Sequence, residues 1–449
     1  MITLWLAACT PPDATPSGET ASTTTATPDD TSPTVPERPV LETVPEAPDL
    51  DGAAGAVRYG ITADVASLDV GGVTWDGYAY NGTVPGPLLR ARVGDVLTVD
   101  FTNALPAPTT VHWHGISAPE AMDGATWLLA PIPELSSYTY AVPLDRAGTF
   151  WYHPHVDVDH QVDLGLYGPI VVEDPADPAI DELVLVFDAW GEVAADEHGL
   201  TVPDDQVWTV NGLSDPVHRA PAGLPQRVRL INAANTGYLD LIWPGATVVG
   251  GDQGLGRVTA EDHLILAPGD RVELFWNVAD VDVSTLPYVP AGGGGAWGSE
   301  RRLFSVETDG VSTDTTTLTP PEPAPSADPT YTDLTYVFEG GADGETWLIN
   351  GEVYPDVTVW TAPLGRPTVI EVRNLSATEH PFHLHGNPFE VLSVDGVPPS
   401  FALYADTVNV PIRSTLRLLL NPDNPGDWML HCHLLQHEEG GMMTVLRVE

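Results

Sequence analysis

The sequence predicts an all-β protein made of three related β-sandwich domains, and three observations support this. Gly (42 residues), Pro (44) and Trp (13) are plentiful, while long runs with helical periodicity are missing. The chain has 449 residues, which suggests three domains at about 150 residues each. One local pattern also occurs three times along the chain.

That pattern is an Asn-Gly turn followed by a strand of alternating apolar and polar residues that ends in asparagine. The three copies are Asn81-Gly82 with residues 93–103, Asn211-Gly212 with 227–232, and Asn350-Gly351 with 368–374. Such turns and strands occur in many β proteins, so the pattern alone leaves unrelated domains as an alternative. Changes in composition place the domains at 57–175, 176–308 and 334–449, with a Thr/Pro-rich linker at 309–333.

The N-terminal segment has a composition unlike that of the domains. Residues 1–9 end in Leu-Ala-Ala-Cys, which resembles a bacterial lipobox, although the apolar run is short and no basic residue precedes it. Residues 10–56 are rich in Thr, Pro and acids and predict a disordered tether. We therefore expect a lipid on Cys9 and a cell-envelope protein, periplasmic or anchored in the outer membrane of a bacterium. The alternative is a chance match.

Charge and cysteine content exclude several classes of function. The chain has 63 acidic and 17 basic residues, a net charge of −46, so it lacks the basic face that binding to nucleic acid requires. Its two cysteines, Cys9 and Cys432, offer no disulfide framework. No segment after the N-terminus is long and apolar enough to cross a bilayer. We expect a soluble domain assembly that is monomeric.

Histidines are concentrated in four short motifs. Ten of the 14 lie at His112 and His114, His153 and His155, His380, His383 and His385, and His431, His433 and His437. On a strand, residues two apart point to the same face. Each such pair can therefore serve one metal centre without moving the backbone. Scattered structural histidines would not give this spacing.

The last motif contains the ligands of a blue copper site. A thiolate, two imidazoles and a weak thioether stabilise such a copper, and Cys432, His437 and Met442 supply three of these groups. By strand parity His380 faces away from His383 and His385, as Cys432 faces away from its neighbours, so we take His380 to complete the set. His431 and His433 face the opposite way and must reach a second centre. The eight remaining imidazoles suit three coppers there. A buried free cysteine among core histidines is the alternative.

These four motifs resemble those of the multicopper oxidases, which include laccases, bilirubin oxidases and bacterial cuprous oxidases, and the likeness covers residues 57–449. The resemblance implies three cupredoxin-like Greek-key domains and four coppers, with a trinuclear cluster between the first and third domains and the second as a spacer. It also implies the ligands of that cluster: His112 and His383 for a type 2 copper, His114, His153 and His433 for one type 3 copper, and His155, His385 and His431 for the other.

The resemblance further implies that a small reducing substrate is oxidised while dioxygen is reduced to water. His437 would be the point where electrons enter, through an exposed imidazole edge, unless it is a buried ligand only. Asp123 and Glu438 match acidic positions of similar bacterial oxidases and would relay protons. Asp406 reads as a structural contact. We interpret the other histidines as solvated or structural: His160, His198, His218 and His263.

Three alternatives to a laccase-like oxidase of phenols or aromatic amines stay open. A copper-storing protein would bind copper without turnover, but storage needs no cysteine flanked by ligands of a second centre. A copper nitrite reductase typically has fewer histidine pairs. A cuprous oxidase needs thioethers for Cu(I), and among the five methionines only Met122 is free for a substrate ion.

Overall fold

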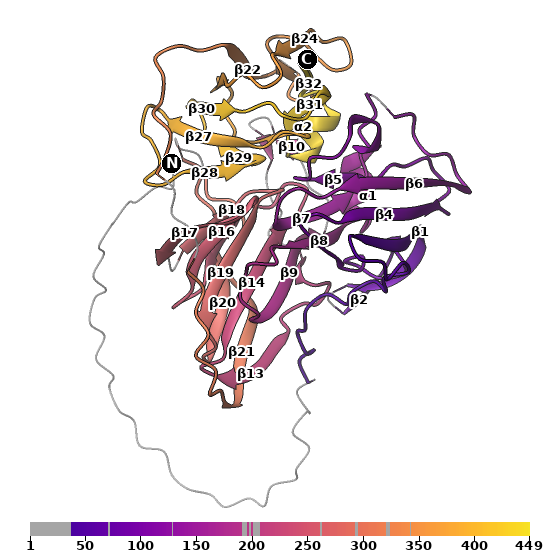
Figure 1. Cartoon of the computed structure of the whole chain (residues 1–449), viewed down its shortest axis with the longest axis vertical. Coiled ribbons are helices and arrows are strands. Elements are labelled where there is room, and N and C mark those ends of the chain that lie inside the picture. The colour runs from indigo at the N-terminus through magenta and orange to yellow at the C-terminus, as the bar shows by residue number, and fades with distance from the viewer. Residues whose placement is uncertain are drawn as a thin grey trace, which may run out of the picture.

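The computed structural model describes residues 37–449 except 71, 128, 191–194, 197–198, 201–206, 261–262, 292–294, 320–323 and 342. Nearly all regular structure in these residues is β, which confirms the predicted fold class. Three pairs of sheets follow one another along the chain (Figure 1).

The first pair of sheets packs around a core that includes Leu97, Val99 and Phe101, the buried residues of an alternating strand. The sheets have the orders β2-β1-β4-β6 and β3-β8-β7-β5. Their elements are β1 (Ala56–Val70), β2 (Val73–Tyr80), β3 (Leu89–Arg92), β4 (Val96–Asn103), β5 (His112–His114), η1 (Glu120–Met122), β6 (Ser136–Pro143), β7 (Gly148–His153), α1 (Val158–Asp163) and β8 (Gly168–Glu173).

The second pair has the orders β12-β9-β14-β19-β16-β17 and β13-β21-β20-β15-β18, with a separate β10-β11 ribbon. The strands are β9 (Asp181–Trp190), β10 (Ala195–Asp196), β11 (Gly199–Leu200), β12 (Val207–Val210), β13 (Val217–Ala222), β14 (Pro225–Asn232), β15 (Leu239–Ile242), β16 (Thr247–Gly251), β17 (Gly254–Ala260), β18 (His263–Leu266), β19 (Arg271–Asn277), β20 (Val281–Leu286) and β21 (Arg301–Val311).

The third pair has the orders β23-β22-β25-β30-β27-β28 and β24-β32-β31-β26-β29. Its elements are β22 (Leu334–Gly340), β23 (Trp347–Ile349), β24 (Val359–Ala362), β25 (Thr368–Asn374), β26 (His380–Leu384), β27 (Phe389–Val394), β28 (Leu403–Ala405), β29 (Thr407–Val410), β30 (Thr415–Leu420), β31 (Gly426–Cys432), α2 (Leu435–Glu439) and β32 (Met443–Val448). The third domain lies against both the first and the second (Figure 1).

The repeated sequence pattern has the same physical role in each domain. The asparagine of each Asn-Gly turn has a positive φ, 54°, 51° and 56° in chain order, a conformation that asparagine tolerates better than most residues. The asparagine that ends each strand is buried, and its amide donates to backbone carbonyls across the sandwich. These strand-ending residues are Asn103, Asn232 and Asn374. Each one therefore ties the end of a strand to a loop.

The N-terminal segment departs from the expected disordered tether over 10–56. From residue 37 the chain runs along the second and first domains, where Leu41 N donates to Val217 O at 2.8 Å and Ala47 N to Leu88 O at 2.9 Å. Leu41 and Val44 are buried. The expectation is corrected for residues 37–55, because these apolar side chains have cores to enter. Cys9 and the rest of residues 1–36 lie outside the described residues. Among the described residues, no helix could span a membrane.

Candidate metal centre

The three strongest ligand candidates of the predicted blue copper site meet at one point. His380 Nδ1 lies 3.3 Å from Cys432 Sγ and 3.1 Å from His437 Nδ1, and the last two atoms are 3.6 Å apart. Strand β26 supplies His380, β31 supplies Cys432, and the short helix α2 supplies His437. Met442 follows α2 and is buried in the same core as Cys432. These two imidazole nitrogens and one sulfur lie close enough together to hold one soft metal ion.

Burial decides the protonation of this group in the metal-free chain. It raises the pKa of the Cys432 thiol well above its ordinary value and lowers the pKa of His380 to about 3. The imidazole of His380 is therefore a neutral donor. Only a bound cation can stabilise the thiolate of Cys432 in this buried position. The other ring nitrogen of His380 lies 2.7 Å from Ser376 Oγ, which fixes the ring.

The other eight motif histidines form a single buried nest between the first and third domains. Residues opposite one another on paired strands bring them together: His112 faces His153 across β5 and β7, and His383 faces His431 across β26 and β31. The two domains interleave here, because His114 stacks on His383 with ring centroids 3.8 Å apart. A second stack, also at 3.8 Å, joins His112 and His385. The structure thus brings together all eight residues that parity assigned to the second centre.

Several imidazole nitrogens in this nest have no hydrogen-bond partner, although they are buried. An unsatisfied buried polar atom costs about 1–3 kcal/mol. The unpartnered atoms are His112 Nε2, His155 Nε2, His383 Nε2 and both ring nitrogens of His433. In addition, His385 Nε2 and His431 Nε2 lie 3.1 Å apart. The donor set therefore fits bound metal ions.

Neighbouring oxygens fix which nitrogen each ring presents. His112 Nδ1 lies 2.9 Å from Asp123 O, and His383 Nδ1 lies 3.0 Å from Asp406 O. A ring that donates from Nδ1 keeps Nε2 as the lone-pair donor for a metal. The nitrogen groupings that could hold an ion include His112/His383/His385, His112/His114/His153 and His155/His385/His431.

Two buried carboxylates, those of the expected proton relays Asp123 and Glu438, lie against the nest. Asp123 Oδ2 lies 2.8 Å from His385 Nδ1, and Glu438 Oε2 lies 3.0 Å from His431 Nδ1. Burial opposes ionisation of Asp123, but the attraction of His385 and His112 holds its pKa well below the ordinary value. The pKa of Glu438 is likewise lowered, because His431 outweighs burial. Asp123 Oδ1 has no hydrogen bond, and Glu438 Oε1 lies 3.4 Å from His155 Nε2.

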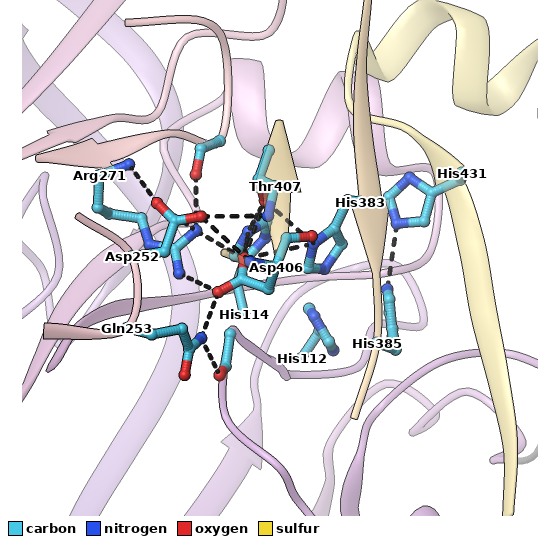
Figure 2. A network of polar contacts seen from close by, with 12 residues as sticks. His112, His114, Asp252, Gln253, Arg271, His383, His385, Asp406, Thr407 and His431 are labelled. Carbon is cyan, nitrogen blue, oxygen red and sulfur yellow. Dashed lines mark hydrogen bonds and ion pairs between the residues drawn. The ribbon is translucent and has the colours of Figure 1, made fainter. Parts of the chain in front are cut away.

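Asp406 connects the nest to the second domain (Figure 2). Its Oδ1 lies 3.2 Å from His114 Nε2 and 2.8 Å from Arg271 Nη1, and Gln253 Nε2 donates to its Oδ2 at 2.6 Å. Arg271 outweighs the burial that would raise the pKa of Asp406 and holds it well below the ordinary value. Asp252 accepts the Thr407 backbone N–H at 3.1 Å. The second domain therefore supports the nest directly, a role that the sequence analysis missed.

His437 corrects one expectation. The predicted exposed edge is absent from the described structure, because the residue is only 1% exposed. The indole of Trp347 stacks on the imidazole with ring centroids 3.6 Å apart. The sequence carried no signal for this contact, since the two residues are far apart along the chain.

The remaining expected residues lie outside both groups. His160 is exposed, and His263 is paired with Asp240 at 3.2 Å on the surface. His218 is buried but lies 3.1 Å from Leu41 O. His198 falls outside the described residues. Met122 is partly buried beside Tyr138.

Comparisons with known proteins agree with this geometry. Two family models, both described as multicopper oxidase, match residues 64–177 and 323–449. The chain is similar to the multicopper oxidase MmcO of Mycobacterium tuberculosis, at 30% identity over 86% of each chain. It is also similar to Laccase-3 of Thanatephorus cucumeris, at 27% identity over 87% of this chain and 91% of that protein.

Two solved structures give the same picture. A metallo-oxidase from Campylobacter jejuni superposes with a TM-score of 0.77 at 25% identity, covering 92% of this chain and 96% of that chain. A multi-copper oxidase from Pseudomonas thermotolerans has a TM-score of 0.75 at 29% identity, covering 88% and 100%.

Proposed function

This chain belongs to the multicopper oxidase family, and from that premise we propose a laccase-like enzyme whose donors are phenols or aromatic amines. As a member, it binds four coppers and couples oxidation of a reducing substrate to reduction of dioxygen. The observation that carries the proposal is the position of Cys432. Its thiol points to His380 and His437, and both residues bonded to it, His431 and His433, point into the nest.

The ligand assignment is the one that the family resemblance implies, and the unpartnered nitrogens and convergent donors support it. We assign the type 1 copper to His380, Cys432, His437 and Met442, and the type 2 copper to His112 and His383. The type 3 pair is assigned to His114, His153 and His433 for one ion and to His155, His385 and His431 for the other. When bound, these ions supply the redox chemistry, with one-electron oxidation at the first site and four-electron reduction of dioxygen at the other three.

The protein contributes the electron path between the two sites. One peptide bond joins Cys432 to His431 and another joins it to His433, so the path is almost entirely covalent. His431 Nδ1 also lies 3.1 Å from Cys432 O, which gives a shorter through-space link. Because β31 pairs with β26 and β32, its backbone is held on both sides and this link is rigid.

Protons reach the nest through its two carboxylates. Reduction of dioxygen to two waters consumes four protons, and a buried site needs groups that exchange them. Asp123 touches His385 with Oδ2 and keeps Oδ1 free of hydrogen bonds, whereas both oxygens of Glu438 face imidazoles, Oε2 at 3.0 Å from His431 Nδ1 and Oε1 at 3.4 Å from His155 Nε2. Each carboxylate can therefore exchange a proton with an imidazole that it touches while it orients that ligand.

The distribution of sulfur argues against Cu(I) as the preferred donor. A soft ion needs thioether ligands, yet among the described methionines Met429, Met442 and Met443 are buried, and Met122 is partly buried. Steady-state kcat/KM for a substituted phenol and for Cu(I), on one copper-loaded preparation, tests the proposal. We expect the phenol to be preferred. A clear preference for Cu(I) would reject the donor assignment in favour of a cuprous oxidase.

We also propose attachment to a membrane through Cys9, on the strength of the Leu-Ala-Ala-Cys sequence alone. A lipid anchor of two or more chains gives stable attachment. Expression of the whole gene should place the protein in a membrane fraction that only detergent releases, and Cys9→Ser should give soluble protein. Equal solubility of the two forms would refute the anchor.

A further inference from the structure

The indole of Trp347 covers one face of the imidazole of His437. The two rings are nearly parallel, with an interplanar angle of 25° and centroids 3.6 Å apart. His437 is 1% exposed, and its Nε2 is buried without a partner, whereas Trp347 is partly exposed. A donor at the surface can therefore touch the indole, whereas the imidazole has almost no exposed atoms to offer it.

Two glycines make this stack possible. A Cβ on Gly440 would lie 2.8 Å from Trp347 Cδ1, and a Cβ on Gly340 would lie 3.3 Å from Cζ3. The backbone N–H of Trp347 also donates to Gly440 O at 2.9 Å, which ties the indole to the end of helix α2. A side chain at either glycine would therefore collide with the indole or crowd it. The hydrogen bond to Gly440 O holds the backbone of Trp347 beside α2, where the indole can stack on His437.

We propose that Trp347, and not His437, is the residue that the reducing substrate contacts, and that the electron crosses the indole to reach the type 1 site. This inference rests on the proposed function. Aromatic donors stack on indole faces or edges, so the contact selects aromatic substrates. Exposed acidic residues lie close to it along the chain: Asp343 and Glu345 precede Trp347, and Glu439 precedes Gly440, whose carbonyl accepts the Trp347 backbone N–H. Neutral and cationic donors are therefore favoured over anionic ones.

The redox step balances without a radical on the protein. A phenol gives up one electron and its hydroxyl proton, so that its O–H bond breaks and a phenoxyl radical leaves. The proton would pass to bulk water, and the electron would be accepted by the copper that His380, Cys432, His437 and Met442 would hold. The indole has the same electron count before and after, since it serves only as the medium between donor and imidazole.

The test uses Trp347→Leu, Trp347→Phe and a matched control, Trp360→Phe, which alters another partly buried tryptophan of the third domain. On copper-loaded protein without oxygen, a phenol and a cationic aromatic amine should bleach the blue absorption. Loss of stacking in Trp347→Leu should raise the KM of aromatic donors about two- to twelvefold and lower kcat, with unchanged blue absorption. Trp347→Phe keeps a smaller aromatic face and should lie between Trp347→Leu and the parent, whereas the Trp360→Phe control should behave like the parent.

A second readout does not depend on turnover. In the copper-free chain, diethyl pyrocarbonate should leave His437 unmodified in the parent and modify it in Trp347→Leu, as mapped by mass spectrometry of peptides. Bleaching by the cationic amine should slow as salt is added, because salt screens the carboxylates.

The outcomes separate this inference from the proposed function. Suppose that every donor bleaches Trp347→Leu as fast as the parent, or faster. The indole then only shields His437, and the inference fails. The same holds if His437 is modified in the parent. If no aromatic donor bleaches the parent at all, the proposed function itself fails.

Discussion

Replacing Arg271 by methionine should destabilise the junction of the three domains more than any surface change. Arg271 is fully buried at the start of β19 in the second domain. Its guanidinium donates to both oxygens of Asp406 in the third domain, and to Thr149 O in the first domain at 3.0 Å. One side chain therefore joins all three domains.

The expected magnitude follows from what the substitution leaves behind. Methionine fills much of the volume, but the Asp406 carboxylate would stay buried beside neutral histidines and without its cation. Removal of one partner of a buried ion pair costs about 3–5 kcal/mol. We therefore expect Arg271→Met to lower the free energy of unfolding of the copper-free chain by about that amount. Asp406 also orients His114, so copper affinity should fall about 10–100-fold.

A double-mutant cycle in urea, followed by tryptophan fluorescence, separates the pair from general damage. Asp406→Asn removes the charge but keeps an acceptor for His114, so the variant with both changes should lose about 0.5–3 kcal/mol less than the sum of the two single variants. Arg219→Met is the matched control, because this arginine pairs with Glu307 at the surface. A loss below about 1 kcal/mol for Arg271→Met would refute the reasoning, since that is the range of exposed ion pairs.

Two further outcomes are expected. Asp123→Asn and Glu438→Gln keep the shape of the side chain but remove a group that exchanges protons. Each variant should retain its copper and take up oxygen about 10²–10⁴-fold more slowly than the parent. Parental rates in both variants would exclude the relay. Asp188 accepts the Tyr167 hydroxyl at 2.7 Å, and burial raises its pKa from 3.8 to about 8. The folded state therefore holds this proton longer than the unfolded state, so stability falls by about 1.4 kcal/mol per pH unit between about 4 and 8. Asp188→Asn should flatten urea midpoints over that range, and an unchanged slope would contradict the assignment.

Strand periodicity explains why much of the site was readable from the sequence. A period of two puts His431 and His433 on one face of the strand and Cys432 on the other. The pairing of β26 with β31 then brings the histidines of β26 next to them. The all-β class followed from composition and is confirmed. His437 lies on the helix α2, where strand parity carries no information, and its assignment followed from the ligand types that a blue copper site needs beside Cys432.

The features that the sequence could not reveal come from contacts between distant segments. In the sequence Arg271 is an ordinary residue at the start of a strand. Only the packing of the three domains brings its guanidinium against the carboxylate of Asp406. Trp347 reads as one of 13 tryptophans, and its stack on His437 needs the close approach at Gly440. Likewise, Leu41 looked isolated in a polar tether because the core that buries it belongs to the second domain.

The central claim is that electrons taken at Cys432 reduce dioxygen in the histidine nest. The most direct test compares the parent with Cys432→Ser for copper content, blue absorption and oxygen consumed per donor oxidised. The parent should consume one dioxygen for every four electrons taken from the donor. The variant should keep the copper of the nest but lose both the blue absorption and the oxygen uptake, because serine cannot supply the thiolate. Blue absorption or donor-dependent oxygen uptake that survives in Cys432→Ser would contradict the account.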